Sequence, residues 1–327
     1  MSLRTKVCSF VAGLMSLGLG SVAGAQDYPA RTIALIVPFA AGGPTDVVAR
    51  IIGDHMSKTL GRQIEIENVV GGGGTTATTR VMRAAPDGYT IELGHMGTHA
   101  AAVGLYRNLA YNPTTDFDPI GMVTGTPIVI LARKDFPAAN LKEFVAYVKA
   151  NADNLNMAHA GVSSVSFTTC QLLNSILGVK PATVPYNGTG PAMNALAGGQ
   201  VDYMCDQIVN AVSPVTGGTI KAYAVATAAR NRMLPDVPTT KEAGLPEFEV
   251  SAWNALFAPK GTPKPILDKL TDALDKGLSD VTTRKRLFDL GSDIPDAPRR
   301  GQEALATLVR NEIARWTPVI TGGRPVN

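Results

Sequence analysis

The segment from Ile33 to Leu60 constrains the fold of this 327-residue chain most strongly, because it reads as a strand, a glycine loop and a helix. Ile33–Val37 is an apolar run typical of a strand covered on both faces. Gly43 and Pro44 suit the cap and the first position of the helix that follows. Such a helix start favours an anion, since its backbone N–H groups are unpaired and its dipole is positive there. The loop lacks the P-loop and dinucleotide signatures, so we expect an anion smaller than a nucleotide, such as a carboxylate.

A second loop repeats part of this pattern. The segment Val184-Pro-Tyr-Asn-Gly-Thr-Gly-Pro191 shares the Val-Pro-aromatic start and the Gly-Pro end of the first loop, and a helical segment follows it. The match covers few positions, and both chance and a repeated unit explain it. If the unit is repeated, the two loops are expected to face one ligand from opposite sides.

The N-terminus has the features of a secretory signal peptide. Arg4 and Lys6 precede an apolar run from Val7 to Gly20, and a small-residue cleavage site ends at Ala25. We therefore expect residues 1–25 to be removed, so that the mature, exported chain begins near Gln26. No later run approaches the roughly 18 apolar residues of a membrane-spanning helix.

The mature chain is nearly neutral. Removing the two signal cations lowers the formal charge from +3 to +1 (3 − 2), which argues against nucleic acid or an anionic membrane surface as a partner. Cys170 and Cys205 remain, and their spacing does not decide whether they form a disulfide. No metal-ligand pattern is present, and we expect neither a metal nor a cofactor.

Short apolar runs alternate with helical periods from Gln26 onward, which predicts an α/β fold with largely parallel strands. Polar or glycine-rich loops follow most of the predicted strands, and ligands bind at that end of parallel sheets. Two lobes built in this way would hold a ligand in the cleft between them. The later elements include two apolar runs at 120–123 and 128–132, split by Thr124-Gly-Thr-Pro127, and closing helices at 266–290 and 303–316.

The sequence shows no catalytic pattern. It has no Gly-x-Ser-x-Gly elbow, and His95 and His99 lack the Glu of a His-Glu-x-x-His motif. We expect these two histidines to have a polar-lining or structural role. His159 lies at a predicted strand end, where ligand contact and plain packing are equally open. The rival hypothesis is an exported α/β hydrolase or isomerase that uses His99 or His159 as its base.

Several polar and glycine residues have two interpretations each. Ser163 and Ser164 are either donors to a ligand carboxylate or helix caps. Asp46 either stabilises a helix start or fixes ordered water at the site. Gly71–Gly74 permits either a tight turn or a close backbone approach. For Asp206, at the end of an apolar strand, we favour a side chain that faces the cleft.

A series of motifs runs in order along the mature chain. It includes Val37-Pro-Phe-Ala-Ala-Gly-Gly-Pro-Thr-Asp46, Glu67-Asn-Val-Val-Gly-Gly-Gly-Gly74, Ala85-Pro-Asp-Gly-Tyr-Thr90, Gly97-Thr-His-Ala100, Val184-Pro-Tyr-Asn-Gly188, Gly198-Gly-Gln-Val-Asp202 and Ala258-Pro-Lys-Gly-Thr-Pro263. In these motifs the chain resembles the extracytoplasmic solute receptors of tripartite tricarboxylate transporters, also called Bug-type receptors.

This resemblance implies a two-lobed periplasmic binding protein of a type II-like α/β fold. Each lobe would be a mixed, mostly parallel sheet flanked by helices, with the ligand cleft between the lobes. Residues 26–127 with 247–327 would form lobe 1, and residues 128–246 would form lobe 2. The implied function is to capture a mono-, di- or aromatic carboxylate in the periplasm and deliver it to the membrane permease subunits of a tripartite transporter. We expect a monomer without enzymatic activity.

The resemblance also implies a set of ligand-binding residues. In the family, the first loop and the loop after the crossover hold one carboxylate group, and the far side of the cleft is built by other loops. The family's Gly-Ser-Ala-Gly reads Ala158-His159-Ala160-Gly161 here, and Phe167 replaces a common His, which points to an aromatic or longer carboxylate. The expected site comprises Phe39, Ala41, Gly42, Gly43, Thr45, Asp46, Thr98, His99, His159, Gly161, Ser163, Ser164, Tyr186, Asn187 and Asp206.

Overall fold

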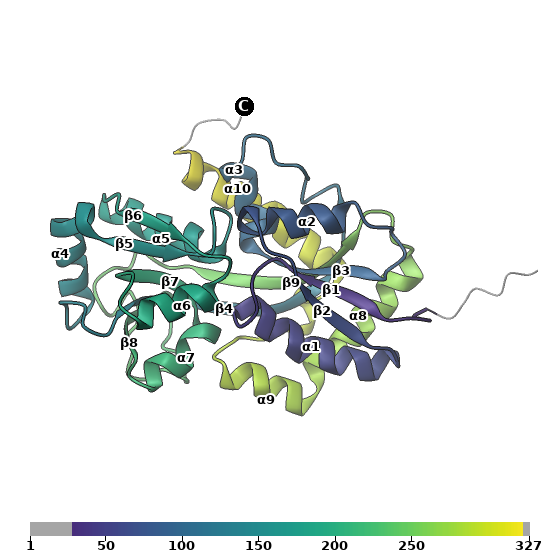
Figure 1. Ribbon diagram of the computed structural model, residues 1–327. Helices are drawn as coiled ribbons and strands as arrows, with labels where there is room; N and C mark the ends of the chain where they lie inside the picture. Colours follow the sequence, from purple (N-terminus) through teal and green to yellow (C-terminus); the bar gives the residue numbers. More distant parts are fainter. Residues whose placement is uncertain (1–27, 323–327) are drawn as a thin grey trace, which may run out of the picture.

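The computed structural model describes residues 28–322 (Figure 1), so the signal peptide predicted for residues 1–25 lies outside the described residues. Two groups of elements lie side by side in Figure 1, and strand β4 (Phe117–Arg133) passes from one group to the other. We call the group around β1 (Ile33–Val37) the first lobe and the group around β5 (Asn156–His159) the second lobe.

The sheet of the first lobe is mixed. Strand β1 pairs in parallel with β2 and β3, and β9 runs antiparallel to both β3 and β4. Alternate side chains of β1 point to opposite faces, because the side-chain period of a strand is two. Leu35 therefore packs into one core and Ile36 into another. The strand order is β2 (Ile64–Asn68), β1, β3 (Thr90–His95), β9 (Ser251–Pro259) and β4.

The sheet of the second lobe is also mixed. Strand β5 pairs in parallel with β6 and β7, whereas β4 runs antiparallel to β7 and β8. Here the strand order is β8 (Ile220–Val225), β4, β7 (Tyr203–Gln207), β5 and β6 (Ala182–Pro185). Together the two sheets and their helices form a two-lobed α/β fold.

Strand β4 contains both apolar runs, at 120–123 and 128–132, as one continuous strand. Residues 117–127 pair with β9 and residues 128–133 pair with β7 and β8. The polar residues between the runs fit a buried strand since their hydroxyls find partners: Thr126 donates to Gln207 Oε1 (2.6 Å), and Thr124 accepts from Asn254 Nδ2 (3.2 Å). Threonine is also a favourable strand residue.

Helices cover both faces of each sheet (Figure 1). In the first lobe, α1 (Pro44–Leu60), α8 (Lys264–Ser279) and α9 (Val281–Asp289) share one core, and α2 (Thr75–Met82) and α10 (Gln302–Thr321) cover the other face. In the second lobe, α4 (Leu141–Asn151) and α5 (Val165–Leu177) lie on one face, and α6 (Thr189–Ala197) and α7 (Ile208–Thr216) on the other.

The helix expected at 266–290 is interrupted, which corrects that prediction. Helix α8 ends at Ser279, and α9 begins at Val281. The residue between them, Asp280, has extended backbone angles, and its Oδ1 accepts the N–H of Thr283 at 2.8 Å. Aspartate is a preferred N-cap because it satisfies an otherwise unpaired donor of the first turn, so a new helix starts here.

Two further features of the fold are the segment after β3 and the cysteine pair. Gly97–Ala101 forms a π-helical turn that leads into the short helix α3 (Ala102–Leu105). Cys170 of α5 and Cys205 of β7 are buried and form a disulfide, a pairing that the sequence left open. No helix within residues 28–322 combines the length and the apolar character needed to cross a membrane.

Candidate functional site

Helices α1, α5, α6 and α7 all begin at one cavity between the two lobes. The first N–H groups of a helix have no partner within the helix, and the helix dipole is positive at this end. The cavity is therefore surrounded by neutral groups that favour negative charge. It is lined by Phe39, Ala40, Gly43, Pro44, Thr45, Asp46, His95, Ala160, Ser164, Val165, Ser166, Thr189, Asp206 and Gln207.

The cavity is narrow in this arrangement of the lobes. It comprises about 310 Å³ of space outside the atoms, of which about 20 Å³ is wide enough for the centre of a water molecule. A cavity needs roughly 10–15 Å³ by this measure to hold one water. An organic ligand therefore requires the lobes to separate or the lining side chains to move before it enters.

The local sequence explains why each helix starts where it does. Gly43 caps α1 with an extended backbone, and Pro44 occupies the first position, where its missing N–H is not needed. Ser164 caps α5: its hydroxyl accepts the N–H of Phe167 (3.1 Å) and donates to the carbonyl of Gly161 (2.7 Å). The cap interpretation of Ser164 and its place in the cavity wall are therefore compatible.

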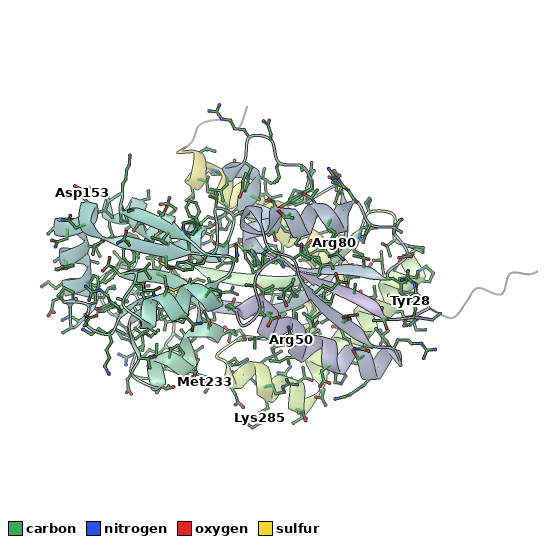
Figure 2. The ribbon with its side chains drawn as sticks, in the orientation of Figure 1. Tyr28, Arg50, Arg80, Asp153, Met233 and Lys285 are labelled. Atoms are coloured by element: carbon green, nitrogen blue, oxygen red, sulfur yellow. A yellow bond between two sulfur atoms is a disulfide. The ribbon has the colours of Figure 1, made fainter. Side chains whose placement is uncertain are left out.

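Asp46 fixes the loop that precedes α1. Its carboxylate accepts the N–H of Gly42 (3.0 Å), an amide hydrogen of Asn68 (3.0 Å) and two hydrogen bonds from Arg50 (2.9 and 3.0 Å). Burial raises the pKa of Asp46, but these donors outweigh it and the pKa is lowered. Figure 2 shows Arg50 on α1 of the first lobe, near the middle of the molecule. The charge of Asp46 is thus compensated by its own partners.

Asp206 and His95 face the cavity in neutral surroundings. The carboxyl of Asp206 is fully buried and accepts the N–H of Gln207 (2.8 Å) and an amide hydrogen of Asn210 (2.7 Å). Burial raises its pKa to about 7. Burial also lowers the pKa of His95 to about 3, so this ring is neutral at pH 7 and stacks on Phe39 with centroids 5.1 Å apart.

Among the described residues that line the cavity there is no lysine or arginine. The polar lining consists instead of hydroxyl, amide, carboxyl and imidazole groups. Burying an anion is costly unless it is hydrogen-bonded, and the helix starts with the hydroxyls of Thr45 and Thr189 supply donors for this purpose. Nor do residues 28–322 contain a group of three or more His, Cys, Asp and Glu side chains placed to hold a metal ion.

The lobes contact each other through backbone next to the cavity. The N–H of Ala40 in the first lobe donates to the carbonyl of Asn187 in the second (2.9 Å). Ser163 Oγ donates to the carbonyl of Gly73 (2.7 Å), and a Cβ on Gly73 would lie 2.7 Å from the nitrogen of Ser163. Gly73 thus allows a close backbone approach between residues 90 positions apart in sequence, and its positive φ of 66° also serves a turn.

The structure divides the expected site residues into two sets. Those that line the cavity are Phe39, Gly43, Thr45, Asp46, Ser164 and Asp206. Among the others, Ala41 and Gly42 line an outer groove against α6 and α7. His99 is buried behind β3 and stacks on Phe257 with centroids 3.8 Å apart. The remaining expected residues are not among those that line the cavity, although Ser163 and Asn187 take part in the lobe contact: Thr98, His159, Gly161, Ser163, Tyr186 and Asn187.

Further lining residues were not in the expected set. Thr189 lies in the second loop, and its helix start joins the cavity opposite Gly43, as the loop resemblance would require. Ser166 belongs to a hydroxyl-rich segment and His95 to a strand end, so both carried a sequence signal. Gln207 carried none, because an amide between two apolar segments has no motif. The remaining members contribute small or apolar surface: Ala40, Pro44, Ala160 and Val165.

Comparisons with known proteins identify the relatives of this chain. The family model described as the tripartite tricarboxylate transporter family receptor, TctC, matches residues 48–323. MatC from Rhodopseudomonas palustris, solved with bound malate, is 55% identical and superposes with a TM-score of 0.88, covering 90% of this chain and 100% of its own. The periplasmic binding protein BugD is 46% identical, with a TM-score of 0.87 and coverage of 90% and 98%.

An R. palustris protein solved with adipate is 30% identical, with a TM-score of 0.85 and coverage of 90% of this chain and 99% of its own. The family match spans most of the chain, and the solved relatives share both its sequence and its fold. The chain therefore belongs to the TctC family of tripartite tricarboxylate transporter receptors, which are periplasmic binding proteins and not enzymes.

Proposed function

We propose that this protein captures a compact dicarboxylate of the malate class in the periplasm and delivers it unaltered to the membrane subunits of a tripartite transporter. The observation that carries the proposal is the meeting of several helix starts at one cavity whose described lining has no lysine or arginine. Neutral donors of this kind bind a carboxylate and release it more readily than a buried ion pair would. The malate found in MatC, at 55% identity, supports the choice of ligand class.

The positions of His159 and Phe167 favour a compact ligand over an aromatic one. His159 and Phe167, whose presence pointed to an aromatic carboxylate, pack against each other with ring centroids 4.9 Å apart. Neither residue lines the cavity. These two residues, which differ from the family pattern, therefore pack against each other beside the site and provide no specific space for an aromatic ring of the ligand.

Capture by lobe closure follows from the same geometry. The contacts of Gly73 with Ser163 and of Ala40 with Asn187 join the lobes at the edge of the cavity. We infer that these contacts break when the lobes open for the ligand and form again when they close around it. The chain crosses between the lobes near 127 and near 247, which suits a hinge. The closed form would be the state that the permease recognises.

Titration calorimetry against malate, succinate, tartrate, adipate and benzoate tests the proposal, with mass spectrometry of the recovered ligand. We expect the short dicarboxylates to bind most tightly and to be recovered unchanged. Chemical conversion of a tightly bound ligand, or binding of benzoate alone, would overturn the proposal.

A matched pair of variants tests the site itself. Gly43 and Gly301 both cap helices with extended backbone, at φ −86° and −69°. A Cβ on Gly43 would lie 3.4 Å from the hydroxyl of Thr189, so the branches of a valine would enter the cavity, whereas Gly301 has open space around it. Gly43→Val should abolish binding and Gly301→Val should preserve it, while both keep the circular dichroism of the parent. Equal affinities would contradict the assignment.

A further inference from the structure

The carboxyl group of Asp206 lacks a compensating positive charge. It lies at the carboxyl end of β7, fully buried, and its described hydrogen-bond donors are the neutral N–H of Gln207 and the amide of Asn210. The hydroxyl of Thr189 lies beside it. Asp46, by contrast, is ion-paired with Arg50. Of the two carboxyl groups that line the cavity, Asp206 is thus the one held by neutral partners.

The titratable groups around Asp206 do not supply the missing charge. On the first lobe they are Asp46, paired with Arg50, and His95, which burial keeps neutral. On the second lobe, His159 at the end of β5 has its pKa lowered by burial, and its Nδ1 accepts the N–H of Gly161. The neighbouring positions on the other packed elements are uncharged: Val129 on β4, Ser164 and Ser166 on α5, Thr189 on α6 and Asn210 on α7.

We propose that Asp206 binds the ligand as the neutral acid, so that each dicarboxylate is captured together with one proton. This inference rests on the proposed function. An ionised Asp206 would place a like charge in the same buried cavity as the ligand, and such pairs are strongly unfavourable at low dielectric. The protonated carboxyl instead offers an O–H donor to a ligand oxygen, in addition to the donors of the helix starts.

Near pH 7 the protonated and ionised forms of Asp206 are close in free energy in the protein without ligand. Burial raises the pKa of Asp206 to about 7, while the hydrogen bonds from Asn210 and Gln207 oppose that shift. A bound anion raises the pKa further, because it disfavours a second negative charge nearby. Above pH 7 the protein must therefore take up a proton as it binds, and affinity must fall as pH rises.

The test is calorimetric titration of malate into the full mature protein between pH 6.5 and 8.5, where the ligand itself is fully ionised. Over this range we expect Kd to rise about 25-fold, from the linkage relation with a free-protein pKa near 7. Parallel titrations at pH 8 in buffers of different ionisation enthalpy should report an uptake approaching one proton per ligand.

Asp206→Asn keeps the size and neutrality of the protonated group, so its Kd should vary little with pH. Asp268→Asn is the matched control: Asp268 is an exposed residue of α8, and the variant should retain the pH dependence of the parent. An Asp206→Asn variant with the parental pH dependence would overturn the inference. If that variant does not fold, the number of protons that the parent takes up per ligand decides the question alone. An uptake of zero would then refute proton coupling.

The outcomes separate this inference from the proposed function. Tight binding of malate without proton uptake and with constant Kd would refute the role of Asp206 and leave the receptor function intact. Failure of every short dicarboxylate to bind at any pH in the range would count against the receptor assignment itself, and proton coupling would fall with it.

Discussion

Replacing Gly73 by alanine should weaken ligand binding by preventing full contact between the lobes. Gly73 lies in the left-handed region, with φ 66° and ψ 24°. A Cβ at this position would lie 2.7 Å from the nitrogen of Ser163, 2.9 Å from that of Val162 and 3.1 Å from the carbonyl carbon of Gly161. All three atoms are backbone of the second lobe, so no side-chain rotation can relieve the overlap.

The expected magnitude combines two terms that act on different states. A non-glycine residue in the left-handed region costs about 1–2 kcal/mol, and this strain is present whether the lobes are open or closed. The overlap with the second lobe exists only in the closed form, and overpacking of this kind typically costs about 1–3 kcal/mol. If the overlap destabilises the closed form by about 2 kcal/mol, the Kd for malate should rise roughly 30-fold.

Gly178→Ala is the control for the strain term. Gly178 ends α5 with φ 71° and ψ 31°, close to the angles of Gly73, and a Cβ there would meet nothing within 4 Å. Calorimetry and thermal unfolding of both variants separate the terms: both should lose stability, and Gly73→Ala should also lose affinity. If both variants keep the parental Kd, the contact at Gly73 does not belong to the ligand-bound form.

Further predictions concern stability. Glu92 is fully buried, and burial raises its pKa to about 8, above 4.5 in the unfolded chain. The folded form therefore holds one proton that the unfolded chain releases. Urea unfolding should show that the free energy of unfolding of the parent falls by about 1.4 kcal/mol per pH unit between pH 5 and 8 relative to Glu92→Gln. The same pH dependence in both proteins would contradict this. Replacing both Cys170 and Cys205 by serine removes a disulfide that joins positions 35 apart in sequence, which should lower the free energy of unfolding by about 4 kcal/mol in the same assay. No loss of stability would mean that the thiols are unpaired. Ser164→Ala removes the cap of α5, so it should lower the free energy of unfolding by about 1 kcal/mol and should also weaken malate binding measurably. Unchanged stability and unchanged affinity would exclude both roles of Ser164.

Local sequence patterns were sufficient for the elements that build the first loop. The run Ile33–Val37, the cap at Gly43 and the proline at the first helical position predict a strand, a turn and a helix, because each signal acts within a few residues. The structure has β1 at Ile33–Val37 and α1 from Pro44. The family motifs, which lie in order along the chain, added the fold class.

The same local signals failed where a distant partner decided the outcome. Thr124 and Thr126 lie in a polar segment that splits two apolar runs, but β9 and Gln207 satisfy their backbone and hydroxyl groups and keep β4 continuous. Asp280 reads as one polar residue within a long helix, but its side chain caps a new one. In both cases the choice depends on which hydrogen-bond partners are within reach, and a window of neighbouring residues does not contain that information.

The sequence by itself determined that the chain is an α/β receptor with glycine loops at its helix starts. Only the tertiary structure decided which of these loops meet, that Cys170 pairs with Cys205, and that Asp206 shares a cavity with His95 of the other lobe. The reason is physical: helix starts and turns are set by interactions among adjacent residues, whereas burial, pKa shifts and contacts across a cleft arise only when segments far apart in the chain exclude water together.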